Sequence, residues 1–203
     1  MSKKDHNTED ELTELEKFEI FVVQNAKLIV GGAIAILLAV SAWAIGDNFY
    51  KANKLKNVYE ISEAKTEKEL NDVIAKFGAS DFTFSAQFKL AKIYVDQKKT
   101  DEAIKVYKEI VNSAPISVLK VRAKLNIAAL LQNAGKTQDA IATFKEAATT
   151  KDVDSNLRAE AKYSLASIYI SQNKVEDAKK LLKEIDANEP VWGIEADLAL
   201  KRM

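Results

Sequence analysis

The chain of 203 residues contains no cysteine and a single histidine, His6, in its polar N-terminal segment. Without cysteine it forms no disulfide, thiolate zinc site or iron-sulfur cluster and has no thiol nucleophile. Because no histidine follows residue 6, imidazole-based catalysis or metal binding in a folded domain is also excluded. Adjacent acidic residues such as Glu176 and Asp177 point to different faces of a helix and do not form an acid-base pair. The sequence predicts a protein that is not an enzyme, with no catalytic residues, metal or cofactor.

Proline and glycine are also scarce, with two and six residues respectively. This leaves little material for the turns of a β-rich fold, and apolar residues recur at helical spacing. The net charge is zero: residues 1–27 hold four lysines against seven acidic residues, and the remainder holds 26 basic and 23 acidic residues. Neither part has the basic excess of a nucleic-acid-binding protein. We therefore expect an all-α protein with no nucleic-acid partner.

The longest apolar run extends from Leu28 to Ile45, 18 positions without a charge. At ~1.5 Å per helical residue it reaches about 27 Å, close to the hydrocarbon thickness of a bilayer. A cleaved signal peptide would begin with a short basic region, whereas an acidic segment of 27 residues precedes this run. A core helix in a domain of this size would keep a polar face. The sequence predicts an uncleaved, single-pass transmembrane anchor at residues 28–46, embedded in the membrane.

Three features surround this predicted anchor. Apolar residues at three- and four-residue spacing precede it, and they form either an amphipathic helix in the membrane interface or the first turns of the transmembrane helix (Leu12, Leu15, Phe18, Phe21 and Val22). Small residues on one face, Gly31, Ala35 and Ala39, predict a contact face for another transmembrane helix. Four lysines precede the anchor and four follow it closely, so the positive-inside rule leaves its orientation open.

A repeat occupies much of the remaining chain. Residues 96–103, 133–140 and 171–178 are similar, which gives periods of 37 and 38 residues. Each copy lies within the tetratricopeptide pattern W-x2-L-G-x2-Y, A-x3-F, P, although the Trp position is polar in all three, as Gln87, Lys124 and Lys162. The residues that match are Leu90, Ala91, Tyr94, Ala103 and Tyr107 in the first copy, Ile127, Ala128, Leu131, Ala140 and Phe144 in the second, and Leu165, Ala166, Tyr169, Ala178 and Leu182 in the third. From Phe84 to Pro190 the chain resembles the tetratricopeptide repeat family, which implies stacked helical hairpins.

The resemblance makes further predictions about turns and junctions. Gly135 and Asn173 lie where a first helix ends in a left-handed conformation, and Lys98 takes this place in the first repeat, at a cost in strain. Thr100 and Thr137 are predicted N-caps of the second helices. Two junctions are expected to be longer than usual, Pro115 to Val121 and Thr150 to Arg158.

We therefore expect an all-α chain with a single N-terminal transmembrane helix, a tetratricopeptide-like helical-hairpin solenoid and a C-terminal capping helix. The predicted segments are an acidic tail with a possible interfacial helix (1–27), the anchor (28–46), a degenerate first hairpin (47–83), three repeats (84–190) and the capping helix (191–203). The two helices of the degenerate hairpin are expected at Phe49 to Ala64, continuous with the anchor, and at Thr66 to Phe77. The apolar residues of the capping helix are Val191, Trp192, Ile194, Leu198 and Leu200.

First helices of tetratricopeptide repeats line a groove, and the residues two before Leu90, Ile127 and Leu165 are expected to face into it. These are Phe88, Leu125 and Tyr163, with Lys89, Lys92, Arg122, Asn126 and Ser164 beside them. A partner segment could bury apolar side chains on the first three residues while the polar neighbours meet its backbone or carboxylates. Alternatively, the three apolar residues pack first helix against first helix.

Two short motifs extend the resemblance over nearly the whole chain. One is Asn25-x-Lys27 followed by Gly31-Gly32, and the other runs from Ala86 through Leu90-Ala91 and Val95-Asp96 to Glu102-Ala103. With these motifs the chain resembles the YfgM-like family of ancillary subunits of the bacterial SecYEG translocon. The resemblance implies an inner-membrane protein with a cytoplasmic N-terminus and a periplasmic repeat domain. It also implies partners, namely the translocon and a membrane-anchored prolyl isomerase chaperone, and a role in linking secreted polypeptides to periplasmic chaperones.

The residues by themselves leave two other functions open. One is a cytoplasm-facing membrane scaffold that assembles a protein complex. The other is a structural protein that forms homo-oligomers. The oligomeric state is not determined by the sequence.

Overall fold

The computed structural model describes residues 13–78 and 80–203, and all regular secondary structure within them is helical, as predicted. The described residues fall into two units, divided between Lys56 and Asn57. Residues 1–12, which include His6 and Leu12, lie outside the described part.

In the first unit, a short helix precedes the apolar run. Helix α1 (Glu14–Gln24) starts in a capping box, in which the Thr13 backbone N–H donates to Glu16 Oε2 at 2.7 Å and the Glu16 N–H donates to Thr13 Oγ1 at 3.3 Å. It ends at Asn25, whose side-chain amide donates to the Phe21 carbonyl at 2.8 Å. Leu15, Phe18, Phe21 and Val22, the described apolar residues before the anchor, thus belong to a separate helix and not to the first turns of the anchor helix.

Helix α2 (Ala26–Glu63) contains the whole apolar run and continues without a break into the second unit, as the sequence predicted. Its run is long and apolar enough to cross a membrane, and none of it is buried in the protein. Leu28, Trp43 and Ile45 are each at least 70% exposed. The space around Gly31 is open, and Ala35 and Ala39 are exposed, so the predicted helix contact face is not covered by the described residues.

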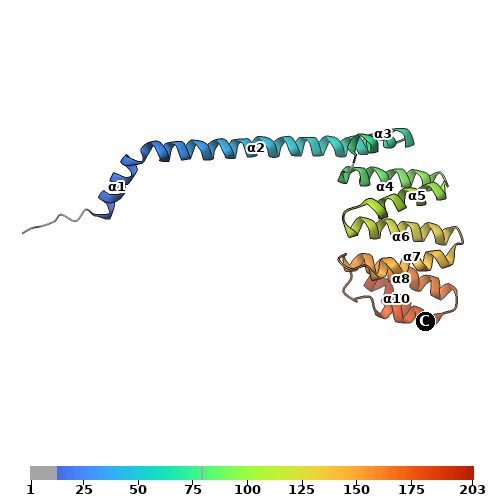
Figure 1. The fold of residues 1–203 in the computed structure, drawn as a ribbon. Helices are drawn as coiled ribbons and strands as arrows, with labels where there is room; N and C mark the ends of the chain where they lie inside the picture. Colours follow the sequence, from blue (N-terminus) through green and yellow to red (C-terminus); the bar gives the residue numbers. More distant parts are fainter. Residues whose placement is uncertain (1–12, 79) are drawn as a thin grey trace, which may run out of the picture. The chain divides into compact units, whose positions relative to one another are not determined.

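The second unit is a stack of antiparallel helices (Figure 1). Each helix from α3 to α9 packs on the next, and the last helix, α10, packs on α8 and α9. The helices are α3 (Glu67–Phe77), α4 (Asp81–Asp96), α5 (Thr100–Ser113), α6 (Ser117–Asn133), α7 (Thr137–Thr149), α8 (Ser155–Ser171), α9 (Val175–Lys183) and α10 (Trp192–Lys201).

The core of this stack follows the small and large positions of the repeat. Ala91, Ala128 and Ala166 are completely buried, which lets the paired helices approach closely. The large residues of the second helices are also buried, with Tyr107 at 6%, Phe144 at 3% and Leu182 at 1% exposure. The core therefore follows the repeat period along the sequence.

The end of α2 and helix α3 form the first hairpin of the stack. Ile61 and Leu70 are buried in the same core cluster as Leu90. Thr66 and Glu69 form a capping box at the start of α3, where the backbone N–H groups of Lys65 and Thr66 hold the pKa of Glu69 below its ordinary value. The helix that carries the apolar run thus also contributes to the core of the repeat domain.

All three repeats make the same turn between their two helices. Lys98, Gly135 and Asn173 adopt positive φ values of 60°, 75° and 58°. In each case the next residue's N–H donates to a carbonyl five residues earlier, as from Lys136 to Leu131 at 2.9 Å. The left-handed turn is therefore confirmed, and Lys98 adopts it without the freedom of glycine.

The predicted caps and junctions were wrong in detail. Thr100 and Thr137 are the first residues of α5 and α7, and the cap positions are Lys99 and Lys136, neither of which makes a side-chain capping bond. Only residues 114–116 separate α5 from α6, and residues 150–154 separate α7 from α8. Most of the Pro115 to Val121 segment belongs to the start of α6, because a helix satisfies its own backbone groups and a long loop does not.

The terminal helix α10 covers the last repeat with only part of its predicted apolar set. Trp192 and Leu200 pack against the cluster around Leu182, and the Trp192 ring lies 5.3 Å from that of Tyr163. By contrast, Val191, Ile194 and Leu198 are 54%, 58% and 39% exposed. The capping face is therefore narrower than predicted.

Candidate functional site

The three apolar residues predicted to face a groove contact other parts of the stack. Leu125 is 4% exposed and lies in the core. Phe88 is partly buried, with its ring 5.8 Å from that of Tyr107 on α5, and Tyr163 packs on Trp192 of α10. Leu125 is thus unavailable to a partner, and Phe88 and Tyr163 offer only part of their surface. The contacts of Phe88 and Tyr163 are to second helix α5 and to terminal helix α10, and thus differ from the packing of first helix against first helix that was the predicted alternative.

The polar residues beside them have separate roles. The Lys89 ammonium donates to the carbonyls of Ile61 and Ser62, both at 2.7 Å, and so satisfies backbone groups at the end of α2. Arg122 of α6 forms an ion pair with Glu160 of α8 at 2.9 Å. Lys92 is exposed, whereas Asn126 and Ser164 are half-buried. The structure does not bring these residues together into one polar site.

The repeat period identifies the part of the first helices that is open to a partner. Lys92, Ala129 and Ser167 are exposed at equivalent positions, 37 and 38 residues apart. Three residues further along, another equivalent set is exposed, in which Val95 and Ile170 are apolar and 37% and 38% exposed. We define the first-helix face as these six residues: Lys92, Val95, Ala129, Gln132, Ser167 and Ile170. Of these six residues sequence analysis selected only Lys92, because its three apolar groove residues lie one helical turn earlier; applying the repeat period to the following turns would have found the whole set.

Few titratable groups in the described residues have an altered pKa. Burial raises the pKa of Tyr94 and of Tyr163 above their ordinary values, and the neighbouring carboxylates of Glu67 and Glu195 raise them further. Burial also raises the pKa of Tyr107. Since no group of three or more metal-binding side chains occurs in the part of the chain that the structure describes, no metal centre can be assigned there.

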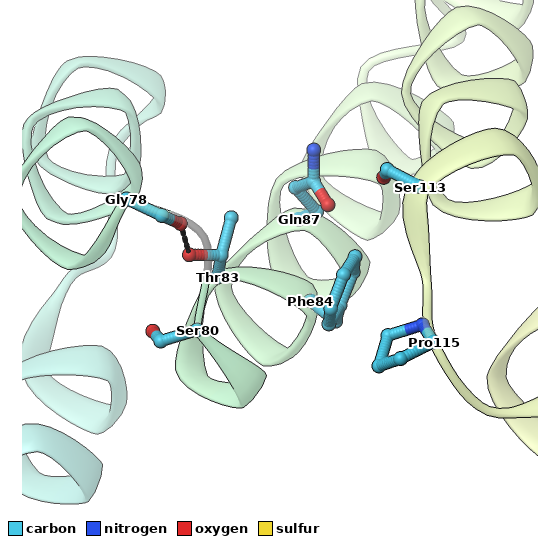
Figure 2. Close-up of a pocket in the computed structure, with 7 residues that line it drawn as sticks. All are labelled: Gly78, Ser80, Thr83, Phe84, Gln87, Ser113 and Pro115. Atoms are coloured by element: carbon cyan, nitrogen blue, oxygen red, sulfur yellow. Dashed lines mark hydrogen bonds between the residues drawn. The ribbon is translucent and has the colours of Figure 1, made fainter.

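A cavity of about 490 Å³ opens at the first repeat (Figure 2). It lies over the start of α4, between the end of α3 and the junction of α5 with α6. Phe84 and Gln87 of α4 are 7% and 8% exposed, and Thr83 donates its hydroxyl hydrogen to the Gly78 carbonyl. The lining residues are Gly78, Ser80, Thr83, Phe84, Gln87, Ser113 and Pro115. Sequence analysis missed this site, and the polar residue at the Trp position does not mark it, because that position is polar in all three repeats.

Comparisons with known proteins agree with this architecture. Residues 85–115 and residues 131–202 match two models of the tetratricopeptide repeat family. Two solved structures of nearly identical TPR-like repeats, assigned to a kinesin light chain of Podosopora anserina, have a similar fold. Both are 18% identical with a TM-score of 0.51 over 75% of this chain, and the match covers 81% of one and 82% of the other. No curated protein sequence matches the chain. The chain is therefore a tetratricopeptide-repeat-containing protein, as its periods of 37 and 38 residues predicted.

Proposed function

We propose that the protein is a non-enzymatic, membrane-anchored adaptor that binds protein partners through its repeat domain. Tetratricopeptide repeats are protein-binding modules, which supports the adaptor role. The observation that carries the membrane part is helix α2, which contains the apolar run and places Ile61 in the core of the repeat domain. Because one continuous helix serves both purposes, anchoring would hold the binding domain at the membrane and raise its effective concentration there.

In more detail, we propose an ancillary translocon subunit in the bacterial inner membrane, with a cytoplasmic N-terminus and a periplasmic repeat domain. It would link secreted polypeptides to periplasmic chaperones, including a membrane-anchored prolyl isomerase. The resemblance to the YfgM-like family supports this proposal. The alternative is a cytoplasm-facing scaffold, which the equal numbers of lysines on the two sides of the apolar run allow equally well.

The position of the repeat domain can be tested by labelling, because the chain has no cysteine. Lys151 is exposed in the junction between α7 and α8. In Lys151→Cys cells, a maleimide that crosses the outer membrane but not the inner one is expected to label the protein before lysis. Glu14→Cys, on the other side of the apolar run, is the matched control and should react only after lysis. The reverse labelling pattern would support the cytoplasm-facing scaffold.

Partner binding is proposed to use the first-helix face. Val95 and Ile170 provide apolar contacts along it, and Lys92 provides a charge at its first-repeat end. The measurement is the amount of translocon channel that is cross-linked to the protein and recovered with it. A combined Lys92→Glu and Ile170→Ser substitution is expected to reduce this amount about tenfold, which corresponds to the loss of one strong interface contact. Because both positions are exposed, the thermal unfolding temperature should stay nearly unchanged.

The control for this test is Lys108→Glu, which makes the same charge change on the exposed side of second helix α5. It is expected to leave recovery unchanged. Equal recovery with the combined variant and with wild type would show that partners bind elsewhere, and no recovery with wild type would contradict the translocon role.

A further inference from the structure

The cavity at the first repeat contains two buried polar atoms without a partner among the described residues, Ser80 Oγ and Gln87 Oε1. Gln87 is only 8% exposed, and its Oε1 accepts no hydrogen bond from any described residue. Figure 2 shows this oxygen between Phe84 and Ser113. A buried acceptor left without a donor costs about 1–3 kcal/mol. A ligand that donates a hydrogen bond here would remove that cost.

The other two repeats show what normally occupies this position. Lys124 and Lys162 are equivalent to Gln87, and each forms an ion pair with a glutamate 22 residues later, at 2.8 Å to Glu146 and 3.3 Å to Glu184. In the first repeat the equivalent glutamate is Glu109, but uncharged Gln87 forms no ion pair with it. The first repeat thus lacks the long, paired side chain that its neighbours have.

The family pattern has tryptophan at the same position. At residue 87 a smaller glutamine takes the place of this ring, and the cavity adjoins it. A smaller equivalent cavity of about 260 Å³ lies beside Lys162 in the third repeat, so the residue at this position does not by itself create the cavity. The first-repeat cavity has an aromatic ring and a proline ring in its wall, Phe84 and Pro115.

The chemistry of the lining restricts what can enter. None of its described residues is charged, so an ionic ligand would lose hydration without gaining a partner. Phe84 and Pro115 favour a flat apolar group, and Gln87 Oε1 requires one donor near it. The volume lies within the range of sites for small ligands. An indole ring, with one N–H on an otherwise apolar body, meets all of these requirements.

We propose that this cavity binds a tryptophan side chain from a partner polypeptide, with the indole N–H donating to Gln87 Oε1 and the ring packed between Phe84 and Pro115. The inference rests on the proposed protein-binding function and adds an anchor residue for the partner. Tryptophan is among the residues that most often dominate a protein interface, since it buries a large area with one polar contact. Ile116, which follows Pro115 and is 53% exposed, extends the apolar surface along the chain next to the cavity.

The test uses the full chain in detergent, with N-acetyl-L-tryptophanamide as the probe. Binding is measured from the change in the NMR signal of the Thr83 methyl group, and the Thr143 methyl group serves as the internal reference. Binding is expected with a Kd of the order of 1 mM. The 1-methylindole analogue, which has no N–H donor, should bind about tenfold more weakly, by the value of one buried hydrogen bond.

Gln87→Lys copies the second and third repeats and is expected to abolish binding, because lysine has no acceptor for the indole N–H and would instead pair with Glu109. Since the fold already accepts this lysine twice, the unfolding temperature should be maintained. Lys124→Gln is the matched control and should leave probe binding unchanged. Gln87→Leu removes the acceptor at similar size and should weaken binding about tenfold, which provides a second measurement if Gln87→Lys does not fold.

Three results would overturn the proposal: no binding by the wild-type chain, equal binding of the two probes, or unchanged binding by Gln87→Lys. The cavity would then hold water or an apolar group that does not use Gln87. The adaptor function is tested separately, because the labelling and cross-linking experiments use Lys151 and the first-helix face. Intact partner recovery together with failed probe binding would remove the tryptophan site alone.

Discussion

Replacing Gly193 by alanine is expected to detach α10 from the last repeat. A Cβ atom at this position would lie 2.6 Å from the Asp186 carbonyl oxygen and 2.7 Å from that of Ala187. Both atoms belong to the backbone, so the segment before α10 would have to move as a whole. Overpacking of this kind costs about 1–3 kcal/mol, and more where the backbone cannot relax. The loss should be concentrated at the C-terminal end, because each repeat contacts only its neighbours.

Trp192 fluorescence provides the measurement, since its ring packs on Tyr163 while Trp43 in α2 stays exposed. We expect a red shift of the Trp192 emission and faster amide hydrogen exchange in α9 and α10, with α4 and α5 unaffected. Ile194→Ala is the matched control on the same helix, because Ile194 is 58% exposed, and it should change neither signal. An unchanged spectrum and an unchanged unfolding temperature for Gly193→Ala would show that α10 does not depend on this close approach.

Replacing Ala128 by leucine is expected to divide the stack at the second repeat. Ala128 is completely buried in the cluster that contains Val121, Phe144 and Leu165, and the helices of this repeat approach each other at the small residue. The added three carbons have no space, so the expected loss is about 1–3 kcal/mol or more. Because the site is central, the repeats on either side should lose their coupling. Thermal unfolding followed by circular dichroism should then become broader and begin at a lower temperature.

The adjacent residue provides a matched control for this substitution. Ala129 is exposed on the first-helix face, and Ala129→Leu makes the same chemical change one residue away. Because leucine and alanine are both good helix formers, this variant should unfold within about 0.5 kcal/mol of wild type. Equal unfolding curves for Ala128→Leu and Ala129→Leu would mean that the helices do not meet at the small residue.

The architecture follows from periodic features of the sequence. The 37- and 38-residue periods place an alanine at each close approach and a large residue at each seam, and tertiary structure reproduces this pattern at Ala91, Ala128 and Ala166. The left-handed turns at Gly135 and Asn173 were equally predictable, because few residues adopt positive φ at low cost. The apolar run in α2 can be recognised for a similar reason, since 18 consecutive uncharged residues are long enough to cross a bilayer and have no polar face.

The candidate sites were much harder to predict. Period analysis places Phe88, Leu125 and Tyr163 at equivalent positions, but their exposure depends on what each meets: Tyr107, the core, and Trp192 respectively. A repeat unit has the same sequence pattern whether its neighbour is another repeat or a terminal helix. Apart from Lys92, the residues that are open to a partner therefore differ from those selected by the pattern.

The sequence by itself determined the helical class, the number and period of the repeats, the turns between their helices and the apolar run that precedes them, because each depends on local spacing along one chain. Only the tertiary structure decided which faces are open, that Gly193 touches the backbone of Asp186 and Ala187, and that Gln87 borders a cavity without the ion pair that Lys124 and Lys162 form. These features depend on contacts between residues of different helices. Their distances and burial are set by packing, which the spacing of residues within one helix does not specify.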